Sequence, residues 1–195
     1  MRIGGLFISV SIIAFLATST AASATAMQVG GRTSQPLGHW QLCRTLPKEC
    51  RARTRGSSAV RMSADVMSLL RTVNARVNRQ VRPITDWDQH GVEERWSYPT
   101  SLGDCEDYVL EKRRILMSYG FRAGDLLITV VAQPNGEGHA VLSVRTDQGE
   151  FILDNIDKRV RHWTKTPYEY IKRQSVRHSG TWVAIKDRRT KLAMR

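Results

Sequence analysis

The stretch Gly103-Asp104-Cys105-Glu106-Asp107-Tyr108 has the composition of a helix start. Acidic side chains are favoured in the first turn of a helix, where they interact with the positive end of the helix dipole. The apolar residues that follow are Tyr108, Val109, Ile115, Leu116 and Tyr119, and Gly120 is a typical stop. This stretch therefore predicts a helix from Asp104 or Cys105 to about Tyr119, with a cysteine in its first turn.

A cysteine at a helix N-terminus is a candidate nucleophile. Free backbone N–H groups and the helix dipole favour the thiolate form of Cys105, which is the reactive form. The same N–H groups could stabilise the oxyanion that forms when a carbonyl is attacked, and Gly103 would let a substrate backbone come close. A buried structural cysteine is the alternative, but apolar packing would not place three acids around the thiol.

These three acids create a difficulty for a thiolate, because carboxylates beside a thiol raise its pKa by like-charge repulsion. A hard cation held by Asp104, Glu106 and Asp107 would neutralise them, and calcium accepts several carboxylate oxygens in flexible geometry. Acids that only complement the helix dipole need no metal and are the alternative. A calcium site beside Cys105 is therefore one of two interpretations of these acids.

A histidine and an aspartate follow on two neighbouring predicted strands. His139 opens a strand after the Gly-rich turn at 134–138, and Asp154 ends the partner strand after a turn at 146–149. This hairpin would bring the two residues together, so that Asp154 could orient the imidazole and stabilise its charged form. Alone, each could be a hydrogen-bonded bystander or a turn residue. With Cys105 they form a candidate catalytic triad.

The remaining periodicity predicts a helix followed by antiparallel strands. Apolar residues at three- and four-residue steps indicate a helix over residues 60–81, which ends before Pro83. The predicted strands cover residues 126–133, 139–145, 150–156 and 182–186, and residues 86–102 are predicted to be loop. Helices that precede a run of strands indicate an α+β fold.

The N-terminus has the pattern of a secretory signal. Residues 1–26 combine a positive start, an apolar run and a tract of small residues. An uncleaved N-terminal anchor is the alternative, but the apolar run is shorter than the roughly 20 residues that a membrane span needs. No second apolar stretch of that length follows. We therefore expect a periplasmic or secreted protein without a transmembrane span after signal removal.

Cysteine spacing and composition divide the rest of the chain. Of the three cysteines, Cys43 and Cys50 enclose a short segment and would pair in an oxidising compartment, which leaves Cys105 free. Residues 27–58 are rich in Gly, Arg, Ser, Thr and Pro and predict an irregular segment that carries this disulfide. Residues 59–195 are predicted to form the hydrolase domain.

The net charge of +12 would attract anionic partners in general. The basic residues are scattered, however, and no RNA-binding or zinc-finger signature accompanies them. Solvated basic faces are the simpler interpretation, and no nucleic-acid partner is expected.

Several blocks resemble the bacterial transglutaminase-like cysteine proteinases, a resemblance that extends over roughly residues 43–185. The blocks are Val77-Asn78-Arg79, Pro83-Ile84-Thr85-Asp86, Gly91-Val92-Glu93-Glu94-Arg95-Trp96, Gly103-Asp104-Cys105-Glu106-Asp107-Tyr108, Gly138-His139-Ala140-Val141-Leu142 and Leu153-Asp154-Asn155. The resemblance implies a papain-like, transglutaminase-like fold in which the nucleophile lies at a helix start packed on an antiparallel sheet. The triad would be Cys105, His139 and Asp154.

The resemblance also implies a substrate class and a metal. Some members of this family are periplasmic proteases that cleave surface adhesins and bind calcium beside the nucleophile. For this chain, that implies a cysteine peptidase with calcium at Asp104, Glu106 and Asp107 and a surface or envelope protein as substrate. An acyl transferase with the same triad and a non-catalytic basic binding protein are the alternatives.

Overall fold

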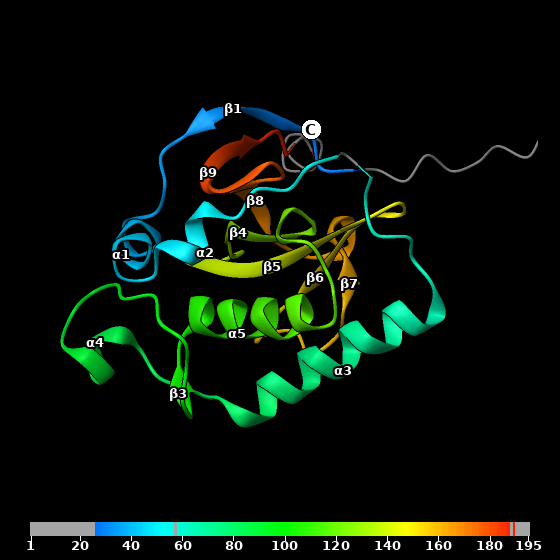
Figure 1. Ribbon diagram of the computed structural model, residues 1–195. Helices are drawn as coiled ribbons and strands as arrows, with labels where there is room; N and C mark the ends of the chain where they lie inside the picture. The colour runs from blue at the N-terminus through cyan, green and yellow to red at the C-terminus, as the bar shows by residue number, and fades with distance from the viewer. Residues whose placement is uncertain (1–25, 57, 188, 190–195) are drawn as a thin grey trace, which may run out of the picture.

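A seven-stranded sheet forms the centre of the protein, in a computed structural model that describes residues 26–56, 58–187 and 189 (Figure 1). All its neighbouring strands are antiparallel, and their order is β1-β9-β8-β4-β5-β6-β7. The strands are β1 (Val29–Thr33), β4 (Leu126–Ala132), β5 (Gly138–Thr146), β6 (Gly149–Leu153), β7 (Arg161–His162), β8 (Glu169–Ser175) and β9 (His178–Ile185). The predicted α+β fold is confirmed, and the predicted strands each lie within or overlap one of these.

Two helices cover one face of the sheet. α5 (Cys105–Ser118) packs against β5 and β4, and α3 (Ala64–Gln80) packs against α5 (Figure 1). The helix predicted over residues 60–81 begins later than expected, because Ser63 caps it by accepting a hydrogen bond from the backbone N–H of Val66. Since side chains alternate along a strand, the opposite face has its own apolar cluster, which includes Val131, Val141 and Tyr170.

Residues 29–51 contain regular elements, so the expectation of an irregular segment is wrong for this part of the range 27–58. These elements are β1, α1 (Leu37–Thr45) and α2 (Pro47–Arg51). β1 pairs with β9, and the two helices are joined by a disulfide between Cys43 and Cys50, as predicted. Composition alone did not indicate β1, because this strand is stabilised by hydrogen bonds to a strand about 150 residues later in the chain.

The segment at 86–102 also contains short elements that periodicity did not indicate. They are α4 (Asp86–His90) and β3 (Leu102–Gly103), which pairs in parallel with β2 (Arg82–Pro83). Two 3-10 turns, η1 (Ala123–Asp125) and η2 (Trp163–Lys165), complete the structure. Among the described residues, no helix combines the length and the apolar character needed to cross a membrane. The predicted signal at 1–26 lies outside the described residues, apart from its last residue.

Candidate active site

The candidate nucleophile lies where β3 meets α5. Cys105 is the first residue of α5, and Asp104 precedes it in extended backbone geometry as the N-cap residue. The pairing of β3 with β2 fixes the chain just before the helix. The prediction of a cysteine in the first helical turn is therefore confirmed, and Cys105 is the free cysteine of the described chain.

Cys105 and His139 open onto the same cavity. This catalytic cavity has a volume of about 460 Å³, and its wall also includes Glu106, Ala140 and Trp96. His139 lies at the start of β5, and α5 packs directly on that strand. The contact between the helix and the sheet thus brings the cysteine and the histidine together, although 34 positions separate them in the sequence.

His139 is held by the predicted aspartate. Its Nε2 atom lies 2.9 Å from Oδ1 of Asp154, and both side chains are buried. Asp154 also accepts hydrogen bonds from the backbone N–H of Ile156 at 2.9 Å and from the hydroxyl of Tyr168. Burial favours the protonated carboxyl, but the hydrogen bonds from His139, Tyr168 and Ile156 prevail and lower the pKa of Asp154. The structure therefore presents an ionised aspartate to the imidazole.

The thiol is not activated by the helix start alone. Its Sγ atom donates a hydrogen bond to Oε2 of Glu106 at 2.9 Å. Burial, together with the Glu106 carboxylate, raises the pKa of Cys105 well above its usual value, while a hydrogen bond with the backbone of Ala140 opposes this. Burial and the adjacent acids therefore favour the protonated sulfur in this arrangement, and the contribution of the acids is the one that the sequence suggested.

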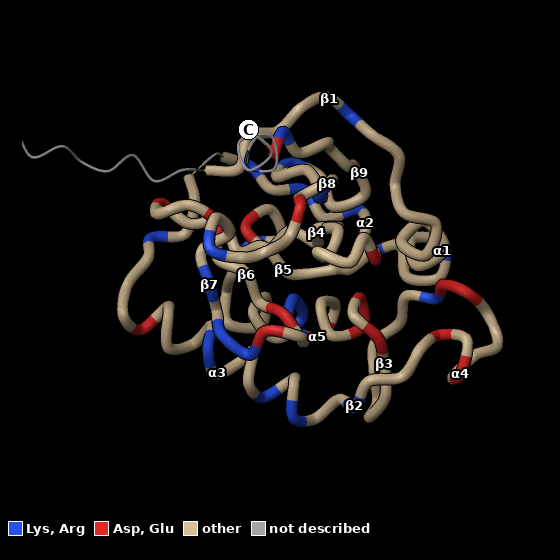
Figure 2. Tube along the Cα trace, turned by 180° about the vertical axis from the view of Figure 1, so that it is seen from behind, with Lys and Arg blue, Asp and Glu red and all other residues tan. Residues whose placement is uncertain are grey.

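Three carboxylates converge beside the thiol. Asp86, Asp104 and Glu106 each place an oxygen within 4.8 Å of the others. Figure 2 shows acidic positions near the start of α5 and β3. Burial and Asp86 raise the pKa of Asp104 to about 6, while burial and Asp104 raise the pKa of Glu106 to about 8. Such raised values show that the negative charges are poorly compensated.

Asp86 is the member of this acidic cluster that the sequence analysis did not assign. It begins α4, and Thr85 caps that helix by accepting a hydrogen bond from the backbone N–H of Asp88. The sequence did contain an indication of its importance, because Asp86 is the last residue of Pro83-Ile84-Thr85-Asp86, one of the blocks that resemble the family. Nothing in the local sequence, however, indicates that this residue folds back onto the start of α5.

Asp107 has different surroundings. Its carboxylate is buried and accepts hydrogen bonds from the backbone N–H of Ser97 at 2.7 Å and from the Ser97 hydroxyl at 3.4 Å. Burial raises its pKa to about 7, against the effect of these hydrogen bonds. A Cβ atom at Gly103 would lie 2.8 Å from this carboxylate, so the glycine accommodates Asp107. Asp107 thus braces the segment around Ser97 and lies outside the group of three converging carboxylates.

The acidic cluster fits a hard divalent cation. Its three ligand groups are all carboxylates, which suit calcium or magnesium better than a transition metal. Oδ1 of Asp104 is buried and has no hydrogen-bond partner among the described residues. A buried carboxylate oxygen without a donor is destabilising unless a cation or water satisfies it.

Known proteins resemble this chain in sequence and in fold. The model of the family described as bacterial transglutaminase-like cysteine proteinase (BTLCP) matches residues 29–190. The solved structure of calcium-bound LapG from Legionella pneumophila is 25% identical, with a TM-score of 0.53 over 61% of this chain and 69% of that one. EGTA-treated LapG is also 25% identical, with a TM-score of 0.52 over 63% of this chain and 69% of that one. No curated protein matches the chain.

The family match covers the helix start, the hairpin and all seven strands of the sheet, and the similarity to LapG confirms the transglutaminase-like fold. It includes the ordered N-terminal segment from β1 onward. The protein belongs to the bacterial transglutaminase-like cysteine proteinases and is a cysteine peptidase.

Proposed function

We propose that this peptidase hydrolyses peptide bonds of a protein substrate with Cys105 as nucleophile, His139 as general base and Asp154 as orienting acid. The observation that carries the proposal is the buried 2.9 Å hydrogen bond between His139 and Asp154 at the edge of a cavity that also contains Cys105. A base oriented by a buried acid and facing a thiol is the arrangement that nucleophilic catalysis requires.

The hydrogen bond to Asp154 supports different roles for the two imidazole nitrogens. Because Nε2 of His139 is bound to Asp154, Nδ1 is the atom left to exchange a proton with Cys105. The Cys105 proton moves to Nδ1, and the thiolate attacks the substrate carbonyl carbon. Backbone N–H groups at the start of α5 stabilise the resulting oxyanion.

The intermediate then collapses. The C–N bond breaks, the leaving amine takes the proton from His139, and a thioester remains on Cys105. His139 next removes a proton from water, which attacks the thioester. The second intermediate releases the new carboxylic acid, and the proton returns to the thiolate.

Asp86, Asp104 and Glu106 would hold a calcium ion in this proposal, with Asp107 fixing the neighbouring segment. A bound calcium ion would supply the positive charge that offsets the carboxylates beside the thiol. The similarity to calcium-bound LapG supports the choice of metal. The signal pattern of residues 1–26 supports export, so the proposed substrate is a surface or envelope protein outside the cytoplasm.

The reaction is tested by incubating the purified protein with unfolded casein and a labelled amine, beside Cys105→Ala and Cys105→Ser. We expect new peptide fragments from the wild type alone. Incorporation of the amine without new fragments would instead show acyl transfer. Alkylation of Cys105 by iodoacetamide at the rate of an ordinary thiol, unchanged by His139→Ala, would contradict an activated pair.

The metal is tested separately by isothermal titration with calcium. We expect binding by the wild type and a large loss of affinity in Asp86→Asn and Glu106→Gln. Asp88→Asn, two positions further along α4 and outside the cluster, is the matched control. Equal affinity in all four proteins would exclude calcium from this cluster.

A further inference from the structure

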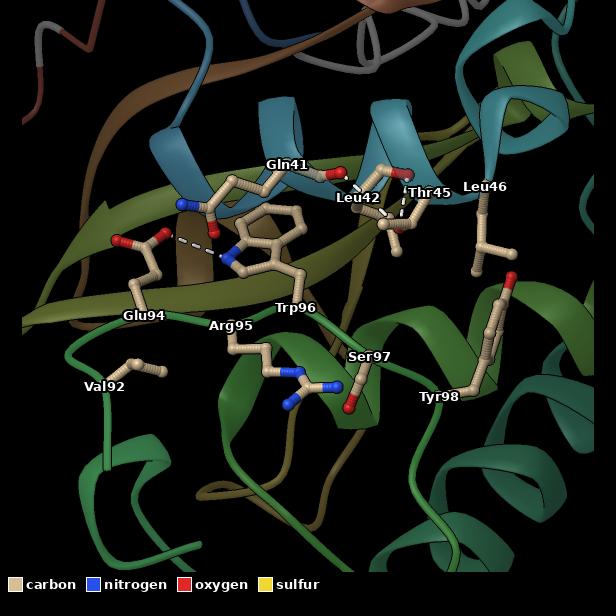
Figure 3. A pocket seen from close by; sticks show the side chains of 10 residues that line it. All are labelled: Gln41, Leu42, Thr45, Leu46, Val92, Glu94, Arg95, Trp96, Ser97 and Tyr98. Atoms are coloured by element: carbon tan, nitrogen blue, oxygen red, sulfur yellow. Dashed lines mark hydrogen bonds between the residues drawn. The ribbon is translucent and has the colours of Figure 1, made fainter. Parts of the chain in front are cut away.

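A second cavity adjoins the catalytic one. It has a volume of about 540 Å³ and lies between the α1–α2 segment and residues 92–98 (Figure 3). Glu94 and Trp96 line both cavities. These two residues form a common wall, and a polypeptide with its scissile bond at Cys105 would reach the second cavity by passing Trp96.

The lining of the second cavity is mainly apolar. Leu46 and Tyr98 face each other at one end, and Trp96 lies in the middle against α1 (Figure 3). Leu46 is 42% exposed, and Val92 on the other wall is 43% exposed. Binding of an apolar group that covers these exposed aliphatic side chains is favourable, because it removes apolar surface from water. The apolar lining suits a leucine, isoleucine or aromatic side chain, and the volume leaves room for neighbouring residues of the same polypeptide.

Residues 92–98 form a wall that is already fixed. The backbone N–H of Arg95 donates to Asp86, and that of Ser97 donates to Asp107 at 2.7 Å. The indole N–H of Trp96 donates to Glu94 at 2.9 Å. The acids around Cys105 thus hold this wall, which links the second cavity to the catalytic site.

The opposite wall is also held in place. The disulfide between Cys43 and Cys50 joins α1 to α2, and Leu46 lies between these cysteines. Gly38 lies so close to Trp96 that a Cβ atom there would overlap the indole ring. Two fixed walls need little reorganisation on binding, which favours affinity for a side chain that fits.

We propose that the second cavity is a substrate subsite that binds a large apolar side chain near the scissile bond. The subsite rests on the proposed function, because its occupant is part of the same polypeptide that Cys105 attacks. It would make the enzyme select cleavage sites by sequence. Val92, Leu46 and Trp96 would be the residues that determine this specificity.

The test uses a library of peptides of known sequence, with cleavage sites identified by mass spectrometry. The full-length wild type is compared with Val92→Asp and Leu46→Asp, which place a carboxylate in the subsite at exposed positions that the fold tolerates. Val29→Asp is the matched control, because Val29 is also 43% exposed and lines neither cavity. Cys105→Ala defines the background, and the alkylation rate of Cys105 reports whether the catalytic cavity is intact.

We expect the wild type and Val29→Asp to prefer a large apolar residue at one position near the scissile bond. In Val92→Asp and Leu46→Asp, kcat/KM for those peptides should fall at least about tenfold, and the preference for the large apolar residue should be lost, whereas Val29→Asp should keep the wild-type kcat/KM and the wild-type rate of Cys105 alkylation. Cleavage that depends on Cys105 but keeps the same preference in both variants would overturn the subsite alone. The absence of any cleavage that depends on Cys105 would overturn the proposed function as well.

Discussion

At the scale of single residues, the site combines one favourable and one unfavourable electrostatic arrangement. Asp154 is stabilised as an anion by three hydrogen-bond donors, which makes it suited to orient His139. Glu106 and Asp104 carry raised pKa values beside the thiol. The described residues already stabilise the charge of Asp154, whereas the carboxylates beside Cys105 need a positive charge to offset them.

Asp154→Asn tests the favourable arrangement. The amide keeps the shape of the side chain but removes the charge that stabilises a protonated imidazole, so kcat/KM should fall by about 10²-fold or more. Steady-state peptide cleavage measures the change, and the melting temperature shows whether the fold is intact. Asp157→Asn, in the following loop, should keep nearly full activity. A similar loss in both variants would assign the effect to the loop.

Lys112 provides a test of pH-dependent stability. It is fully buried, its Nζ atom has no hydrogen-bond partner in the described part of the chain, and burial lowers its pKa to about 7, against the attraction of Asp154. The unfolded chain, with a lysine pKa near 10.4, binds more protons between about pH 7 and pH 10. The contribution of Lys112 to the free energy of unfolding therefore rises with pH in that window, and the full cost of its burial applies below it.

We expect Lys112→Met to be more stable than the wild type at pH 6, with an advantage that shrinks as the pH approaches 10. Thermal unfolding at several pH values measures this difference. The exposed Lys48→Met is the control and should show no such trend. If the stability advantage of Lys112→Met did not change with pH, the pKa of Lys112 would not be lowered in the folded protein.

At the scale of elements, α3 supports the loop that carries the catalytic acid. The side-chain amide of Asn78 donates to the backbone carbonyl of Asp154 at 2.8 Å, and that of Asn74 donates to the carbonyl of Lys158 at 3.1 Å. The two asparagines lie one turn apart, so one face of α3 holds the loop at two points.

Asn78→Ala should destabilise the protein and lower its activity. It leaves the carbonyl of Asp154 without its donor, which costs about 1–3 kcal/mol, and it loosens the position of the acid. Urea unfolding and kcat/KM measure the two effects. The exposed Arg79→Ala, on the other side of α3, should change neither. Full activity in Asn78→Ala would show that the loop is held by other contacts.

The disulfide acts on a second pair of elements, α1 and α2. Its seven-residue separation closes a short loop, for which chain entropy predicts about 2–3 kcal/mol of stabilisation. The variant Cys43→Ser/Cys50→Ser should lose that amount in urea unfolding, and dithiothreitol should no longer affect its stability. Cys105→Ser should keep the response to dithiothreitol. An unchanged stability of the double variant would contradict a structural role for the disulfide.

At the scale of the whole molecule, the acidic cluster joins parts of the chain that are distant in sequence. Asp86 comes from α4, Asp104 precedes α5 and Glu106 lies in its first turn. Calcium bound there should stabilise the folded state as a whole. At a free calcium concentration of about 100 times the dissociation constant, the increase in the free energy of unfolding corresponds to a rise of roughly 5–10 °C in melting temperature.

Differential scanning calorimetry with calcium and with EGTA measures this shift. Asp86→Asn should reduce it strongly, while Asp65→Asn, at the start of α3, should keep it. If calcium raised the melting temperature of Asp86→Asn as much as that of the wild type, the stabilising ion would bind elsewhere.

Much of the site was predictable because its signals are local. The acids and cysteine at 103–107 define a helix start, and alternating apolar residues around a four-residue turn define the β5–β6 hairpin that pairs His139 with Asp154. Elements with few apolar residues or many glycines were missed. β8 has a mixed polar sequence, and β1 contains two glycines. Both strands are stabilised by hydrogen bonds to neighbouring strands and by packing, which no local pattern records.

The sequence by itself determined the helix with Cys105 at its start, the hairpin with its histidine and aspartate, the cysteine pair and the family. These follow from periodicity, turn residues and short motifs, which depend on neighbouring positions in the chain. Only the tertiary structure decided that Asp86 joins Asp104 and Glu106, that Asp107 holds Ser97, and that Trp96 separates two cavities. These are contacts between distant segments, and their geometry is fixed by how α4, α5 and the 92–98 segment pack together.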